Sequence, residues 1–179
     1  KSKYIPFTNS QTRDSKVPDF PTFGTGYHTY VTGLTHNTRG FPATDKQKDH
    51  EELVTRIMTK ISDDREKLTM IEKQNLDDAK IAIVTYGATA RPAETAMEMA
   101  QKKGIKVGLL RLQLVWPFPN KIIQDLAGTV DKIIVPEMNM GQIIHPIREN
   151  ADGQCSIISA PKVGGEMHLP REIYQYLEA

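Results

Sequence analysis

The chain has 179 residues, of which 25% are charged and 39% hydrophobic, and its formal net charge is +1. This balance gives no reason to expect a nucleic acid or an anionic membrane as a partner. No apolar run approaches the roughly 20 residues that a membrane-spanning helix needs, and no secretory signal stands at the start. The single cysteine, Cys155, excludes an internal disulfide and any cysteine-ligated metal cluster built by this chain alone. We therefore expect a cytoplasmic protein.

Residues 1–45 are irregular and rich in proline, glycine and threonine, and they show no helical or strand periodicity. Their aromatic and aliphatic side chains are too numerous to remain in water, so we expect this segment to lie against another surface. The chain begins with Lys1 rather than Met, which favours a piece of a longer polypeptide, although trimming would leave the same start.

One stretch of this segment, residues 31–45, reads VTGLTHNTRGFPATD. A long polar loop in a compact domain is typical of a functional loop, a linker or disorder. Thr32, Thr35, His36 and Arg39 could line a polar site. No carboxylate, cysteine or second histidine stands at a workable spacing, so we favour docking of an irregular connector.

Residues 46–75 are predicted to form one long helix or two short ones. The sequence SDD at residues 62–64 interrupts the pattern and suits the cap of a second helix containing Leu68 and Ile71. Apolar residues recur at three- and four-residue spacing in the first part, which indicates a narrow stripe on a charged helix. They are Leu53, Val54, Ile57, Met58 and Ile61.

From residue 79 onward, short apolar runs alternate with helical patterns, which predicts βαβ units and a mostly parallel sheet covered on both faces. Strands are expected at 80–87, 105–110, 131–137 and 155–160, and helices at 91–104, 118–128, 141–150 and 169–179. Pro146 is unfavourable inside a helix, so the sequence does not fix the first turn of the third helix. The predicted fold is therefore a three-layer α/β/α domain at 79–179, preceded at 1–78 by an irregular connector and an amphipathic helix.

Two strand ends are candidate ligand sites, because ligands of open α/β sheets bind at the carboxyl ends of strands. Gly87 and Thr89 follow the first strand, where the backbone turns into a helix whose N–H groups point outward. Glu137, Asn139 and Gln142 follow the third strand. A carboxylate beside two amides could bind a polar ligand, pin the loop, or face a partner subunit, and we favour the last two.

No catalytic or metal-binding residue is predicted. The sequence has no dinucleotide fingerprint, no phosphate-binding loop, no zinc-protease motif and no nucleophile elbow. The five histidines lack metal-ligand spacing, so each is interpreted as a surface or locally hydrogen-bonded histidine. They are His28, His36, His50, His145 and His168.

Five segments of the sequence nevertheless match, in order, segments of a known protein family. In chain order they read GYHTYVTGLTHNTRGFPATD, RIMTKI, IVTYGATARPAETAMEMA, LRLQLVWPFP and VPEMNMGQ. Over nearly the whole chain, this series resembles the C-terminal part of the alpha subunit of the 2-oxoacid:ferredoxin oxidoreductases, most closely the 2-oxoglutarate synthase branch. The segments VTGLTH, GFP and VPEMNMGQ are specific when they occur together.

The resemblance implies a transketolase C-terminal-like domain in an enzyme that decarboxylates a 2-oxoacid, here 2-oxoglutarate, and forms an acyl-coenzyme A. The whole enzyme would use thiamine diphosphate, Mg and iron–sulfur clusters to reduce ferredoxin. The implied partners are an N-terminal pyrimidine-binding domain of the same subunit, the beta, gamma and ferredoxin-like subunits, and a second copy in a homodimer. Residues 31–45 would then be an interdomain clasp.

The chain lacks the family's diphosphate–magnesium signature, Gly-Asp-Gly followed by Asn-Asn, so no active-site residue can be assigned and the chain alone is expected to be inactive. Three alternatives remain. The first is the C-terminal domain of a transketolase or 2-oxoacid dehydrogenase, which should lack the VTGLTH connector. The second is a stand-alone small-ligand-binding α/β module, and the third is a purely structural oligomerisation domain.

Overall fold

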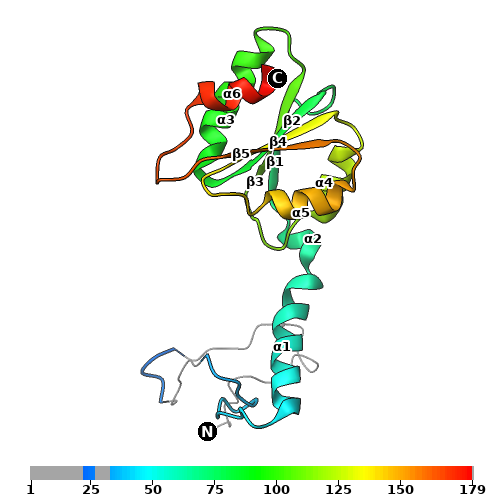
Figure 1. Cartoon of the computed structure of the whole chain (residues 1–179). Helices are drawn as coiled ribbons and strands as arrows, with labels where there is room; N and C mark the ends of the chain where they lie inside the picture. Colours follow the sequence, from blue (N-terminus) through cyan, green and yellow to red (C-terminus); the bar gives the residue numbers. More distant parts are fainter. Residues whose placement is uncertain (1–21, 27–32, 179) are drawn as a thin grey trace. The chain divides into compact units, whose positions relative to one another are not determined.

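The computed structural model describes residues 22–26 and 33–178 (Figure 1). The chain divides into two compact units, Lys1–Arg65 and Glu66–Ala179.

The first unit contains a tight loop followed by helix α1 (Gln47–Ser62). The helix confirms the prediction from apolar spacing, but none of its residues is buried. Val54, Ile57 and Met58 are each between 44% and 50% exposed. The predicted wrapping of residues 1–21 and 27–32 against a surface concerns residues outside the described part of the chain.

The second unit is built on a five-stranded sheet with the strand order β1-β3-β2-β4-β5. Strand β1 pairs antiparallel with β3, and the other pairs are parallel. The strands are β1 (Ile71–Gln74), β2 (Ile81–Tyr86), β3 (Val107–Leu112), β4 (Lys132–Glu137) and β5 (Ser156–Pro161). The four predicted strands are confirmed, each within a few residues of its expected range.

The prediction of a second helix that contains Ile71 is wrong, because Ile71 begins strand β1. The expected second helix ends at Leu68, the last residue of the short helix α2 (Arg65–Leu68), and does not include Ile71. Ile71 begins β1 and pairs with Leu112, while Gln74 pairs with Leu109. Pairing with a neighbouring strand far along the chain overrides the local helical spacing, as strand formation often does.

Helices cover both faces of the sheet (Figure 1). On one face, α3 (Ala90–Gln101) and α6 (Pro170–Glu178) enclose a core that includes Ile83, Leu109 and Ile134. On the other face, α4 (Asn120–Ala127) and α5 (Ile144–Ala151) pack against a second core. That core includes Val84, Leu110 and Ile133.

Neighbouring residues of β2, β3 and β4 contribute alternately to the two cores because successive strand side chains point to opposite faces. This arrangement confirms the predicted three-layer α/β/α fold with a mostly parallel sheet. The second unit, 66–179, begins within α2 and includes β1, whereas the predicted domain begins at residue 79, and that boundary stays a prediction. The interdomain role assigned to residues 1–78 stays a prediction.

The ends of α4 follow the proline and glycine signals in the sequence. Pro119 is the N-cap residue and Gly128 the C-cap residue. A short 3-10 helix, η2 (Gly87–Thr89), joins β2 to α3. Among the described helices, none has the length and hydropathy required to cross a membrane.

Candidate functional site

The predicted site residues of the second unit lie at the carboxyl ends of two adjacent strands. Strand β2 ends at Tyr86 and β4 ends at Glu137, and the two strands pair in parallel. The structure therefore brings the loop after β2 beside the loop after β4, as the strand pattern predicts.

Glu137 is the main polar group at this edge, and its side chain is 1% exposed. Its carboxylate accepts hydrogen bonds from the backbone N–H groups of Gln142, at 3.1 Å to each oxygen, of Ile143 at 2.9 Å, and of Ile144 at 3.0 Å. These are N–H groups that a helix leaves unpaired at its start. Glu137 thus caps helix α5, and its negative charge favours the positive end of that helix.

Tyr86 connects Glu137 to the following loop. The Tyr86 hydroxyl donates to Glu137 Oε2 at 3.3 Å and accepts from Asn139 Nδ2 at 3.1 Å. Asn139 Oδ1 accepts from the backbone N–H of Gly141 at 2.7 Å. Burial, and then the negative charge of Glu137, raise the pKa of Tyr86, so this phenol keeps its proton and remains a donor.

Gly87 and Thr89 shape the turn after β2. Gly87 has a positive φ of 57°, a backbone conformation that glycine adopts readily. Thr89 is buried, and its hydroxyl lies 2.6 Å from both the Thr85 hydroxyl and the Tyr86 carbonyl oxygen. The hydroxyl of Thr89 is therefore used inside the turn.

At the carboxyl ends of β2 and β4, polar groups bond to the loops that follow these strands. The Gln142 contacts to Glu137 come from its backbone N–H, and the residue is exposed. Because both oxygens of Glu137 already accept N–H groups, this carboxylate does not fit a magnesium ion or a thiamine ring as its ligand. Among residues 22–26 and 33–178, no three His, Cys, Asp or Glu side chains are grouped so as to hold a metal ion.

His36 and Arg39 lie in the first unit, in a loop organised by Asn37. Asn37 Oδ1 accepts the backbone N–H groups of Arg39 at 2.9 Å and Phe41 at 3.2 Å. His36 is 8% exposed, its Nδ1 lies 3.1 Å from the Asn37 carbonyl oxygen, and it forms a β-bridge with Pro42. Arg39 is exposed. The described part of this loop is folded on itself, and its predicted role as a clasp stays a prediction.

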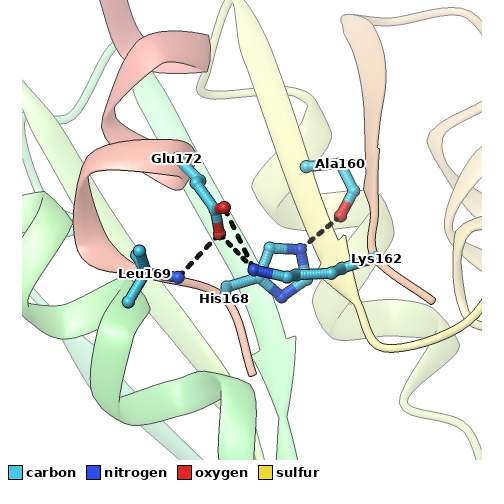
Figure 2. Close-up of polar contacts among 5 residues, drawn as sticks. All are labelled: Ala160, Lys162, His168, Leu169 and Glu172. Carbon is cyan, nitrogen blue, oxygen red and sulfur yellow. Dashed lines mark hydrogen bonds and ion pairs between the residues drawn. The ribbon is translucent and has the colours of Figure 1, made fainter. Parts of the chain in front are cut away.

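A second polar cluster, in the loop between β5 and α6, was missed by the sequence analysis (Figure 2). Lys162 Nζ lies 3.0 Å and 2.7 Å from the two oxygens of Glu172, and Glu172 Oε2 accepts the Leu169 N–H at 2.8 Å. His168 is 5% exposed, and its Nε2 donates to the Ala160 carbonyl at 2.9 Å. Its Nδ1 is buried without a hydrogen-bond partner.

This cluster joins the end of β5 to the start of α6. Glu172 reaches back to the N–H group three residues earlier, which is the glutamate half of a capping box. The glutamate three residues after Leu169 is the signal that could have revealed the contact. His168 matches the expectation of a locally hydrogen-bonded histidine, although the sequence did not show that it is buried.

Comparison with known proteins identifies the family of this chain. The family model described as pyruvate:ferredoxin oxidoreductase core domain II matches residues 79–173. This chain therefore belongs to the pyruvate:ferredoxin oxidoreductase core domain II family.

The similar curated proteins include 2-oxoglutarate synthase subunits. The chain is 39% identical to subunit KorA of Methanothermobacter marburgensis over 96% of this chain and 45% of that subunit. It is 38% identical to KorA of Methanocaldococcus jannaschii over 89% of this chain and 43% of that subunit. The chain thus spans somewhat less than half the length of these relatives.

Two solved structures support the fold. The 2-oxoglutarate:ferredoxin oxidoreductase of Magnetococcus marinus, solved with 2-oxoglutarate, coenzyme A and succinyl-CoA bound, superposes with a TM-score of 0.77 at 24% identity. The match covers 99% of this chain and 31% of that one. A split-gene transketolase, an inactive beta4 tetramer, gives a TM-score of 0.51 at 15% identity, covering 60% of this chain and 40% of that one. The transketolase-type fold predicted for residues 79–179 is confirmed.

Proposed function

We propose that this chain is the C-terminal part of the alpha subunit of a thiamine-diphosphate-dependent 2-oxoacid:ferredoxin oxidoreductase, and that it serves the assembly of that enzyme. The whole enzyme would oxidatively decarboxylate a 2-oxoacid to an acyl-coenzyme A and pass electrons to ferredoxin. The 2-oxoglutarate synthase subunits among the relatives favour 2-oxoglutarate as the substrate.

The burial and hydrogen bonding of Glu137 support an assembly role most directly. It is the buried carboxylate at the edge where an open α/β sheet binds ligands, and both its oxygens accept backbone N–H groups. Thr89 and Asn139 likewise direct their polar atoms to the chain's own loops. Polar groups used in this way stabilise the loops after β2 and β4.

The cofactors and partners follow from the proposed enzyme. Thiamine diphosphate, Mg and the iron–sulfur clusters would be held by other parts of it. The partners would be the N-terminal pyrimidine-binding domain of the same subunit, the beta, gamma and ferredoxin-like subunits, and a second copy in a homodimer. The complex would work in the cytoplasm.

A chimeric subunit tests the proposed function. The matching 45% of M. marburgensis KorA is replaced by this chain and assembled with the other subunits of that enzyme. We expect ferredoxin reduction that requires 2-oxoglutarate, coenzyme A and thiamine diphosphate, while this chain alone gives none. The same experiment with a transketolase C-terminal domain in place of this chain is the control. An assembled but inactive chimera, or activity of the chain alone, would contradict the proposal.

A further inference from the structure

The carboxyl edge of the sheet carries exposed apolar side chains as well as the polar network. Among the described residues of the second unit, every large hydrophobic side chain with substantial exposure lies in a segment at this edge. We call this set the edge surface. Its members are Met70, Leu114, Val115, Trp116, Met138, Met140, Val163, Met167 and Leu169, with exposed fractions between 37% and 78%.

The strand order brings these residues side by side. Residues 114–116 follow β3, Met138 and Met140 follow β4, and the last three members follow β5. Met70 precedes the antiparallel strand β1, and its carbonyl oxygen accepts the N–H groups of Gln113 and Leu114. The edge surface therefore lies at the start of β1 and at the carboxyl ends of β3, β4 and β5, and the small residues after β2 interrupt it.

Charge is absent from the middle of this surface. None of residues 87–90, 113–119 and 138–143 is charged, in a chain of which 25% is charged. The interface cores of protein complexes are depleted in charged residues and enriched in tryptophan, tyrosine and methionine. The edge surface holds the chain's one tryptophan, Trp116, at 59% exposure, and four of its seven methionines.

We propose that the edge surface is covered by an uncharged, apolar face of the rest of the alpha subunit. This inference rests on the proposed function. Two observations favour this occupant. The relatives contain more than half their length beyond the part matched by this chain, which supplies a covalently attached partner. A charged partner would lose hydration against residues 113–119 and 138–143 without gaining an ion pair.

Cysteine labelling in the chimeric subunit tests this surface. Met140, at 78% exposure, is replaced by cysteine in a Cys155→Ser background, and Gln154→Cys, exposed before β5 at the opposite edge, is the matched control. We expect Met140→Cys to react with a maleimide at least about tenfold more slowly in the chimera than in the isolated 179-residue chain, because burial restricts access to the thiol. Gln154→Cys should react equally fast in both.

Each labelling result either supports or overturns the proposed docking surface. Equal labelling of Met140→Cys in the chimera and the isolated chain would overturn it, even if the chimera is active. Slow labelling of the isolated chain that depends on its concentration would make a second copy the occupant and would also overturn it. Protection in an inactive chimera would support the docking surface while the proposed enzyme activity fails, so the two failures are distinguishable.

A second measurement covers a chimera that does not fold. The isolated chain is co-expressed with the unmatched part of M. marburgensis KorA, and the two are co-purified. We expect Met140→Glu to reduce the recovered partner at least about tenfold, because it places a charge in an apolar interface. The Gln154→Glu variant should leave recovery unchanged. Equal recovery with both variants, or no recovery with the unaltered chain, would overturn the proposal.

Discussion

Glu137 and Ile144 are joined by a hydrogen bond of 3.0 Å from the backbone N–H of Ile144 to Glu137 Oε1. The last residue of β4 thereby holds the first turn of α5. The bond is buried, and it links one layer of the domain to the next. The loop between them, which contains Asn139, is consequently fixed at the carboxyl edge of the sheet.

The Glu137→Gln variant should destabilise the second unit. An amide keeps the shape of the side chain but loses the charge and turns a donor toward backbone N–H groups. Hydrogen bonds to a charged group contribute more than neutral ones, so we expect the free energy of unfolding to fall by about 2–3 kcal/mol in urea titrations. Glu149→Gln, exposed on the same helix, is the control and should change it by less than about 0.5 kcal/mol. Equal effects would contradict the capping role.

The Gly108→Ala variant tests the packing of the segment after β1. A methyl group at Gly108 would overlap the Asn75 carbonyl oxygen and approach a Leu76 methyl to 2.7 Å. We expect a loss of about 1–3 kcal/mol in the free energy of unfolding, as for other overpacked sites. Gly128→Ala meets the flexible end of Gln154 and should be nearly neutral. A neutral Gly108→Ala would show that this segment does not lie against β3.

The Lys162 and Glu172 pair should make stability depend on pH. The hydrogen bond from Lys162, and then that from the Leu169 N–H, lower the pKa of Glu172 in the folded protein. A lowered folded-state pKa stabilises the protein above the unfolded-state value of about 4.3, and this contribution is lost as pH falls through the folded-state pKa.

Urea unfolding at a series of pH values measures this contribution. The stability advantage of the unaltered chain over Glu172→Gln should be full near neutral pH and should shrink below about pH 4. Glu166→Gln changes an exposed side chain of the same loop and controls for the altered net charge. A constant advantage of the unaltered chain across the acidic range would rule out this coupling.

The alternating part of the fold was predictable because its strands are short apolar runs with clear stop signals. KIAIVTYG ends at Gly87, and the helix FPNKIIQDLAG lies between Pro119 and Gly128. Strand β1 was not predictable, because IEKQ has a single apolar residue and its partner strand lies far along the chain. Its register depends on Leu112, which no local pattern in residues 65–75 reveals.

The position of the candidate site could be predicted from the sequence, but the hydrogen-bond partners of its side chains could not. Strand-end reasoning placed Glu137, Asn139 and Gln142 at one edge, where they lie. Whether Glu137 is free depends on the loop turning back so that three successive N–H groups point at it. That is a property of the folded backbone. The partner of Tyr86 across the strand pair was hidden for the same reason, since 51 residues separate it from Glu137.

Calorimetric titration of the isolated chain with thiamine diphosphate and magnesium chloride tests the central claim most directly. Glu137, Thr89 and Asn139 already bond to the chain's own loops, so we expect no binding heat for the isolated chain, while the assembled chimeric enzyme should bind the cofactor. Saturable binding to the isolated chain with a micromolar dissociation constant would mean that this unit carries a cofactor site of its own, and would contradict the account.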